Sequence, residues 1–212
     1  MTLRLDHLVL IAPTLAEGLG YVRETLGVDV PPGGKHPLMS THNHVMRLGD
    51  DVFLEVIAVD QDAPPPGRKR WFGLDDAEAI RRRWHAGHRL NAWVAATDDL
   101  AGALQKHGDL FGIATPLTRG AMSWEFAVRP DGELTMDGAL PCLIEWSDHK
   151  NPARNMADLG CKLASFTITH PEEKRAQAIL ADLGFVDNID WREGAQVALG
   201  AEIHTAAGIR QI

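Results

Sequence analysis

The chain has 212 residues, of which 45% are hydrophobic, so it is long enough to bury a sizeable core as one large domain or two small ones. Its formal net charge of -8 argues against binding to nucleic acid, because proteins that bind phosphate backbones gather lysine and arginine on one face. The basic runs at residues 68–70 and 81–83 are short and have acidic residues between them, so we interpret them as a loop and a solvated helix face.

Three further features predict a cytoplasmic protein that does not enter a membrane. No run approaches the roughly 18 consecutive apolar residues that a membrane-spanning helix needs. The first residues lead straight into a strand pattern and lack the basic start and apolar middle of a secretory signal. Cys142 and Cys161 suit neither a disulfide framework nor a zinc-ligand spacing, so we expect reduced thiols.

The first unit of the chain begins with a strand at residues 5–13 and a helix at residues 15–26. Thr14 can accept hydrogen bonds from the first turn of this helix, and Gly27 can take the left-handed conformation that ends it. The turn at residues 49–51 predicts a hairpin between the last two of three short strands. These strands are expected at residues 28–30, 42–48 and 52–59.

The same order of one strand, one helix and three strands recurs twice. In the second unit it falls on a strand at residues 90–96, a helix at 100–106 that ends near Gly108, and strands at 113–117, 122–128 and 140–146. The third unit is abbreviated, with a strand at 163–169, a helix at 172–183, and short strands at 186–191, 196–199 and in the tail to residue 212.

Internal repetition is a stronger guide to the fold than any local pattern. We therefore predict an α+β fold of repeated βαβββ modules. Residues 1–150 hold two paired modules, at 1–60 and 88–150, and residues 151–212 form a short third module. Residues 61–87 form a connector with three consecutive prolines and one helix at 75–84.

Glu55 and Glu145 occupy matching places in the last strands of the first two units, and each lies within an apolar run. A carboxylate inside such a run is costly to bury unless it is paired or binds a cation. If the first and last strands of each unit lie side by side, the two acids converge with His7 in one cleft. One imidazole and two carboxylates suit Fe, Mn, Zn, Ni or Co, with open positions for a bidentate substrate.

Each of these residues also has a structural interpretation. Either acid can face solvent or pair with an arginine such as Arg47 or Arg119, and His7 alone is more often a hydrogen-bonded histidine than a ligand. Strand alternation places His7 on one face with three apolar neighbours, namely Leu5, Val9 and Ile11.

Other candidates for substrate binding are His42, Asn43, His44, Trp71 and Trp124. Alternation predicts that His42 and His44 point inward and that Asn43 points the other way, although a structural role is as good an interpretation for each. The two tryptophans, with Trp146, are candidates for lining an apolar pocket, against a default of core packing. We expect His36 and His149 in solvated loops.

Several stretches resemble glyoxalase-like proteins of the vicinal oxygen chelate superfamily. They are residues 5–10, Thr41-His42-Asn43, residues 53–58, 70–74 and 140–146, and the short third unit. The resemblance covers nearly the whole chain. It implies a curved, mostly antiparallel sheet made by two pseudo-symmetric units around a cleft.

The resemblance also implies metal ligands from the first and last strands of the paired units. This pattern falls on His7, Glu55 and Glu145. The fourth expected position falls on Ala92, which has no donor atom. Either a nearby His42, His44 or water completes the set, or the metal is absent.

Two functions stay open. In the first, a divalent metal acts as a Lewis acid on vicinal oxygens of a small substrate, and Glu145 leaves the metal to serve as a catalytic base, in lyase, isomerase or dioxygenase chemistry. In the second, the chain is a metal-free protein that binds or sequesters a small molecule. The third unit either packs against its own chain or meets its copy in a homodimer.

Overall fold

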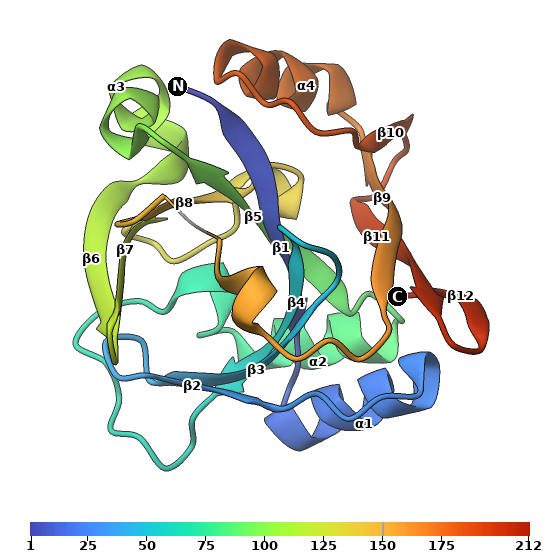
Figure 1. Cartoon of the computed structure of the whole chain (residues 1–212). Coiled ribbons are helices and arrows are strands. Elements are labelled where there is room, and N and C mark those ends of the chain that lie inside the picture. The colour runs from blue at the N-terminus through green and yellow to red at the C-terminus, as the bar shows by residue number, and fades with distance from the viewer. Residues whose placement is uncertain (150) are drawn as a thin grey trace.

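Two β-sheets and four α-helices build the fold in the computed structural model, which describes residues 1–149 and 151–212 (Figure 1). The first unit consists of β1 (Leu3–Ile11), α1 (Leu15–Leu26), β2 (Pro32–His36), β3 (Thr41–Arg47) and β4 (Phe53–Val59). The predicted helix is confirmed at both ends, since Thr14 accepts from the Glu17 N–H and Gly27 has a φ of 75°. The strand β2 lies later in the chain than the predicted residues 28–30. Its position is decided by its pairing with β3, because its own glycine-rich sequence has a low strand propensity.

The connector carries the short turn η1 (Trp71–Gly73) and α2 (Ala77–His85). The second unit follows with β5 (Leu90–Thr97), α3 (Leu100–Phe111), β6 (Ile113–Arg119), β7 (Met122–Val128), η2 (Thr135–Gly138) and β8 (Cys142–Trp146). The helix α3 is kinked at His107, whose φ of -137° is not helical, so the regular helix ends close to the predicted residue 106. A further turn follows the kink and ends at Phe111, which is buried in the core.

The first two units form one eight-stranded sheet with the order β2-β3-β4-β1-β5-β8-β7-β6. β1 pairs in parallel with β4, β5 pairs in parallel with β8, and the other pairs in this sheet are antiparallel. The second half of the order therefore mirrors the first about the β1–β5 pair. This is the predicted α+β architecture of repeated modules in a curved, mostly antiparallel sheet.

The third unit starts with the short turn η3 and forms a second sheet of four strands. It consists of η3 (Pro152–Asn155), β9 (Lys162–His170), α4 (Glu173–Asp182), β10 (Asp190–Glu193), β11 (Ala198–Thr205) and β12 (Gly208–Gln211). Its strands have the order β10-β9-β11-β12, which differs from the pairing in the first two units. The unit packs against its own chain, where Phe166 and Phe185 contact the ring of Trp93 edge-on.

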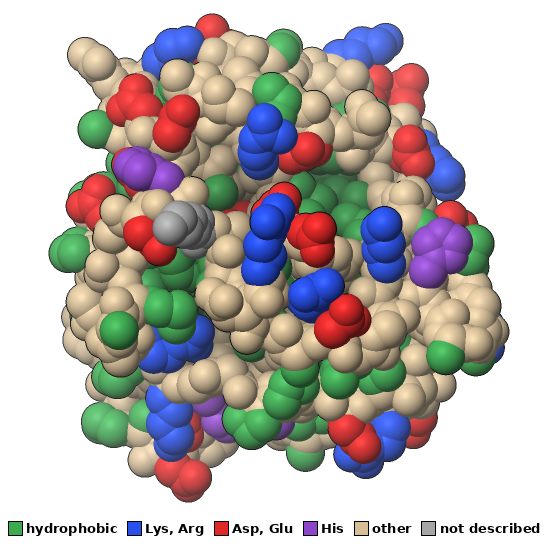
Figure 2. Space-filling view, in the orientation of Figure 1, with side chains coloured by type: hydrophobic (Ala, Val, Ile, Leu, Met, Phe, Trp, Pro, Cys, Tyr) green, Lys and Arg blue, Asp and Glu red, His purple; other side chains and the backbone are tan. Residues whose placement is uncertain are grey.

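Side chains on the two faces of the large sheet form separate cores. One core lies between the sheet, the helices and the third unit, and it includes Leu8, Leu10 and Trp93. The other lies on the concave face and includes Val9, Ile11 and a group of aromatic residues. On the outer surface in Figure 2, acidic and basic side chains are interspersed around a hollow with hydrophobic side chains at its bottom.

Across residues 1–149 and 151–212, the helices are all too short or too polar to cross a membrane.

Candidate functional site

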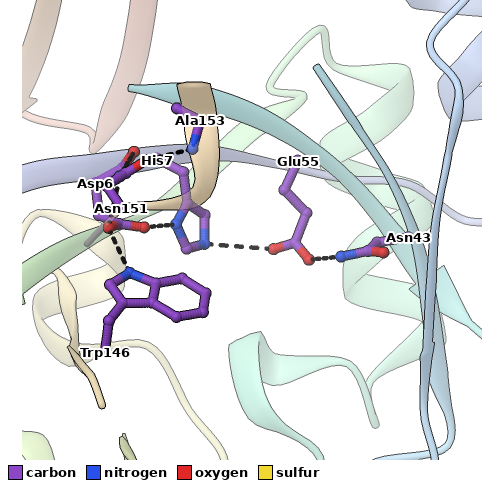
Figure 3. Close-up of polar contacts among 7 residues, drawn as sticks. All are labelled: Asp6, His7, Asn43, Glu55, Trp146, Asn151 and Ala153. Atoms are coloured by element: carbon purple, nitrogen blue, oxygen red, sulfur yellow. Dashed lines mark hydrogen bonds and ion pairs between the residues drawn. The ribbon is translucent and has the colours of Figure 1, made fainter. Parts of the chain in front are cut away.

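His7 and Glu55 meet on the concave face of the large sheet. β1 and β4 are parallel neighbours, and their register pairs His7 with Phe53 and Val9 with Glu55. The Nε2 atom of His7 lies 3.6 Å from Oε2 of Glu55, and the two side chains are 6% and 8% exposed (Figure 3). The imidazole ring also stacks on Phe53, with ring centroids 4.3 Å apart. The site therefore has a buried imidazole–carboxylate pair at its centre.

Asp6 lies directly behind His7 because β1 has a bulge between Leu5 and His7. The bulge changes the alternation of the strand, so Leu5 packs in the opposite core and does not share the face of His7 as we expected. Oδ1 of Asp6 lies 2.6 Å from Nδ1 of His7. Its Oδ2 accepts from Trp146 Nε1 at 2.9 Å and from Asn151 Nδ2 at 2.7 Å. This fully buried carboxylate orients the imidazole and directs its Nε2 toward Glu55.

Asn43 holds the other oxygen of Glu55. Its Nδ2 donates to Glu55 Oε1 at 2.5 Å, and both residues are buried. Asn43 therefore points inward, while His42 and His44 lie on the other face of β3, where Nδ1 of His44 donates to the Val30 carbonyl. This reverses the orientation that we expected for β3.

The charged form of His7 is stabilised by its two carboxylate neighbours, Asp6 and Glu55, and the charged form of Glu55 is stabilised by His7. Burial alone lowers the pKa of His7, but its hydrogen bonds and charge interactions with Asp6 and Glu55 outweigh burial and raise the pKa to about 9. Burial alone raises the pKa of Glu55, but the contacts with His7 outweigh it, and the pKa is lowered. At pH 7 the pair is therefore an imidazolium and a carboxylate.

His36 is a second histidine beside the site. We expected it in a solvated loop, but it ends β2 and is buried against Trp71, with ring centroids 5.1 Å apart. Its Nδ1 is 3.1 Å from Oγ1 of Thr41. Burial lowers the pKa of His36 to about 4, so its ring is neutral at pH 7.

Aromatic rings form the walls of the cleft above the pair. The residues that line it include Trp71, Phe72, Trp124, Phe126 and Trp146. Trp71 and Trp124, both expected to contact a substrate, line the cleft, where Trp71 packs on Phe126 and Trp124 packs on Trp146. Such walls suit an apolar or planar molecule.

The mouth of the cleft is partly covered. Pro152 and Met156, in and beside η3, line it on one side, and Arg119 at the end of β6 lines it on another. The cavity that remains has a volume of about 40 Å³. A cavity needs about 10–15 Å³ to hold one water molecule, so this space holds only a few waters. A substrate therefore requires the covering side chains to move.

Glu145 does not join His7 and Glu55. Its neighbours in β8, Ile144 and Trp146, face the cleft, so Glu145 faces the other way. There its Oε2 accepts from the Leu100 N–H at 2.8 Å and stabilises the start of α3. The exposed His149 lies 4.0 Å from its Oε1.

The ladders show why the repeat alignment placed Glu145 in the site. The repeat places Ala92 at the position of His7, and therefore Val94 at the position of Val9. β1 pairs Val9 with Glu55 and β5 pairs Val94 with Cys142, so the ladders place Cys142, and not Glu145, at the position of Glu55. The sequence alignment was shifted by three residues, and an odd shift along a strand reverses the face.

The donor set does not fit a metal ion held by the protein. Across the part of the chain that the structure describes, no three His, Cys, Asp or Glu side chains are grouped to hold one. The positions that face the cleft in the second unit are Ala92, Val94, Cys142 and Ile144, and burial raises the pKa of the Cys142 thiol to about 12. Catalytic metal sites of this kind use about three protein ligands.

Three residues of the site were missed by sequence reasoning. Asp6 carried no signal because its position depends on the bulge, although its place beside His7 was visible. His36 lies in a stretch with low strand propensity. Arg119 was considered only as a partner for an acid, and only the fold brings the end of β6 to the mouth of the cleft.

A family model described as a glyoxalase-like domain matches residues 5–184. None of the curated proteins matches the sequence. A solved structure of a hypothetical protein from Staphylococcus aureus has a TM-score of 0.61 at 10% identity, over 93% of this chain and 88% of that one. A methylmalonyl-CoA epimerase in complex with methylmalonyl-CoA and NH4+ has a TM-score of 0.40 at 16% identity, over 72% of this chain and 100% of that one. The methylmalonyl-CoA epimerase from Mycobacterium tuberculosis has a TM-score of 0.38 at 12% identity, over 67% of this chain and 85% of that one. At these identities the structural likeness concerns the fold alone.

Proposed function

Because the chain belongs to the family of glyoxalase-like domains in the vicinal oxygen chelate superfamily, we propose that its cleft binds a small carbonyl compound and that His7 and Glu55 catalyse proton transfer at the carbon beside the carbonyl. The observation that carries this proposal is the imidazolium–carboxylate pair, 3.6 Å apart and buried beneath aromatic walls. This pair offers a base and a hydrogen-bond donor side by side, which is what enolate formation needs.

Glu55 is the base in this mechanism. Its Oε2 takes the proton from the carbon, and the C–H electron pair forms a carbon–carbon double bond as the carbonyl electrons move onto oxygen. Asn43 holds Oε1, and Oε2, which lies 3.6 Å from His7 Nε2, is the oxygen that meets the substrate when its reacting carbon enters beside the pair. Glu55 then returns a proton to the carbon, and because its carboxyl proton exchanges with solvent, the net result is exchange of the carbon-bound hydrogen.

His7 stabilises the enolate oxygen. Its Nε2–H donates a hydrogen bond to the negative charge that develops in the transition state, and the low-polarity walls strengthen that interaction. Asp6 keeps the ring in place from the Nδ1 side. Asp6 is therefore a positioning residue, and the catalytic residues are His7 and Glu55.

A second candidate is a binding or sequestering protein without catalysis. The aromatic walls favour it, since they suit the binding of an apolar molecule whether or not proton transfer follows. The two functions differ in one measurable result, which is exchange of a carbon-bound proton with solvent.

The test is hydrogen–deuterium exchange followed by proton NMR in D2O with hydroxyacetone and pyruvate. We expect protein-dependent loss of the proton signals beside the carbonyl, and a rate lower by about 10² to 10⁴ in Glu55→Gln and His7→Gln. Glu145→Gln is the matched control, because it removes a strand carboxylate from the opposite face and should keep the full rate.

The same preparations decide the role of a metal. The mechanism predicts unchanged exchange after dialysis against a chelator and metal well below one equivalent per chain by elemental analysis. Stoichiometric metal that is lost in both His7→Ala and Glu55→Ala would replace this mechanism with a metal-dependent one. Ligand binding without exchange would favour the sequestering protein.

A further inference from the structure

Arg119 bridges the two free edges of the large sheet. It ends β6, which is one edge strand, and its side chain lies along Gly34 of β2, which is the other. A Cβ atom on Gly34 would lie 2.9 Å from Cδ of Arg119, so the absence of a side chain at Gly34 makes room for the arginine. The guanidinium thus lies at the mouth of the cleft.

The guanidinium has no acidic partner. Its Nη1 is buried and makes no hydrogen bond, and no carboxylate of residues 1–149 or 151–212 pairs with it. A buried donor without a partner destabilises the protein, and more so when it is charged. Such a group is expected to gain a partner when a ligand binds.

A second donor of the cleft is also unpartnered. The indole Nε1 of Trp71 is buried without a hydrogen bond, and Trp71 is only 5% exposed. The unpaired Oδ1 of Asn43 is an acceptor, but it lies against Gly33, where a Cβ would be 2.4 Å from it. The residues that line the cleft therefore include two unused donors, Nη1 of Arg119 and Nε1 of Trp71.

The charged groups of the site are separated between its floor and its mouth. Asp6 and Glu55 both lie on His7, Asp6 is also enclosed by hydrogen bonds from Trp146 and Asn151, and His36 is neutral at pH 7. Arg119 is the remaining cation among the lining residues. A ligand with one negative charge complements it.

We infer that Arg119 binds the carboxylate of the substrate, so that the molecules acted on in this cleft are small organic acids with a carbonyl group beside the reacting carbon. This inference rests on the proposed function, since it takes His7 and Glu55 as the reacting end of the same cleft. A guanidinium binds a carboxylate through two parallel hydrogen bonds. A planar carboxylate with a single charge matches one arginine and a small cavity better than a phosphate does.

The experiment compares the binding of three probes of similar shape by isothermal titration calorimetry. Pyruvate carries a carboxylate, hydroxyacetone is neutral, and acetylphosphonate carries a phosphonate. We expect pyruvate to bind more tightly than the other two. Arg119→Gln should weaken pyruvate binding by roughly 10- to 100-fold while hydroxyacetone binding stays the same. Arg119→Lys should recover part of the loss, because it keeps the charge without the two-pronged geometry.

Arg82→Gln is the control, because it removes an exposed arginine from α2. A thermal unfolding midpoint within about 2 °C of that of the unchanged protein ensures that Arg119→Gln is folded. Equal binding of pyruvate by Arg119→Gln overturns the inference, and so does tighter binding of acetylphosphonate than of pyruvate.

Proton exchange on hydroxyacetone separates this inference from the proposed function. If His7 and Glu55 catalyse exchange on the neutral compound while Arg119→Gln leaves pyruvate binding unchanged, the inference fails and the proposed function stands. If pyruvate binding depends on Arg119 but no probe exchanges its protons, the proposed function fails and the carboxylate site stands.

Discussion

Asp6, His7 and Glu55 form a chain of three groups whose protonation depends on their contacts. Asp6 and Glu55 lie on opposite sides of one imidazole, with Nδ1 2.6 Å from the first and Nε2 3.6 Å from the second. Two carboxylates around one buried ring favour its charged form even though burial opposes it. The histidine is thus held as an imidazolium at neutral pH, which is the form that can donate to an enolate oxygen.

At this scale we predict that the protein loses stability as the pH rises above neutrality. The folded-state pKa of His7, about 9, lies above its ordinary value of 6.5, so its stabilising contribution is fully present below pH 6.5 and is lost as the pH approaches 9. The shift corresponds to roughly 3 kcal/mol. Urea unfolding at pH 6 and pH 9 should show this decrease.

His7→Gln is the comparison for that measurement, because it removes the titrating group. Its free energy of unfolding should change less between pH 6 and pH 9 than that of the unchanged protein. An equal decrease in both proteins would assign the pH dependence to other groups. At the acidic end, the lowered pKa of Glu55 predicts a loss of stability as the pH falls below the ordinary glutamate range.

At the scale of elements, strand alternation decides which glutamate belongs to the site. Glu55 and Glu145 lie in similar apolar strands, yet one faces the cleft and the other faces the start of α3. The bulge in β1 has a comparable effect, since it brings Asp6 and His7 onto the same side although they are adjacent in the sequence. Both effects arise from a period of two, in which one residue changes the face.

We therefore predict that Glu145→Ala affects stability and leaves the cleft intact. It removes the acceptor for the Leu100 N–H at the start of α3, which should cost about 1 kcal/mol of stability. Thermal unfolding should show a lower midpoint, while proton exchange with hydroxyacetone keeps its rate. A large loss of exchange without a loss of stability would return Glu145 to the catalytic group.

For the whole molecule, the third unit and the site are physically linked. Phe166 of β9 packs on Trp93 of the central strand β5, and both side chains are buried. The segment that leads into the third unit also contacts the site, because Asn151 donates to Asp6 and Pro152 lines the cleft. In Figure 1, η3 accordingly lies in front of the large sheet.

This shared core predicts that the two sheets unfold together. Phe166→Ala should cost about 3–5 kcal/mol, since it leaves a cavity against Trp93. Tryptophan fluorescence and circular dichroism should still give coincident transitions at a lower denaturant concentration. Two separate transitions would mean that the third unit is an independent domain, as a boundary at residue 150 would allow.

Much of the fold was predictable from local patterns. The first helix has the predicted bounds, because Thr14 and Gly27 act on the backbone next to them. The hairpin between β3 and β4 and the strand β7 were also predicted, since turn residues and apolar runs are local signals. β2 was misplaced because its extent depends on β3, a strand with which it pairs. The kink of α3 at His107 lies close to the predicted end of that helix, and the sequence missed only the last turn to Phe111.

The sequence by itself determined the repeated units, the α+β class, and the presence of a histidine and a glutamate in apolar strands of the first unit. Only the tertiary structure decided which polar side chains share the cleft. A bulge brought in Asp6, the register excluded Glu145, and the approach of the two sheet edges placed Arg119 at the mouth. The physical reason is that local patterns report burial and period, whereas contact between distant strands depends on register, and a shift of one residue there reverses every side chain.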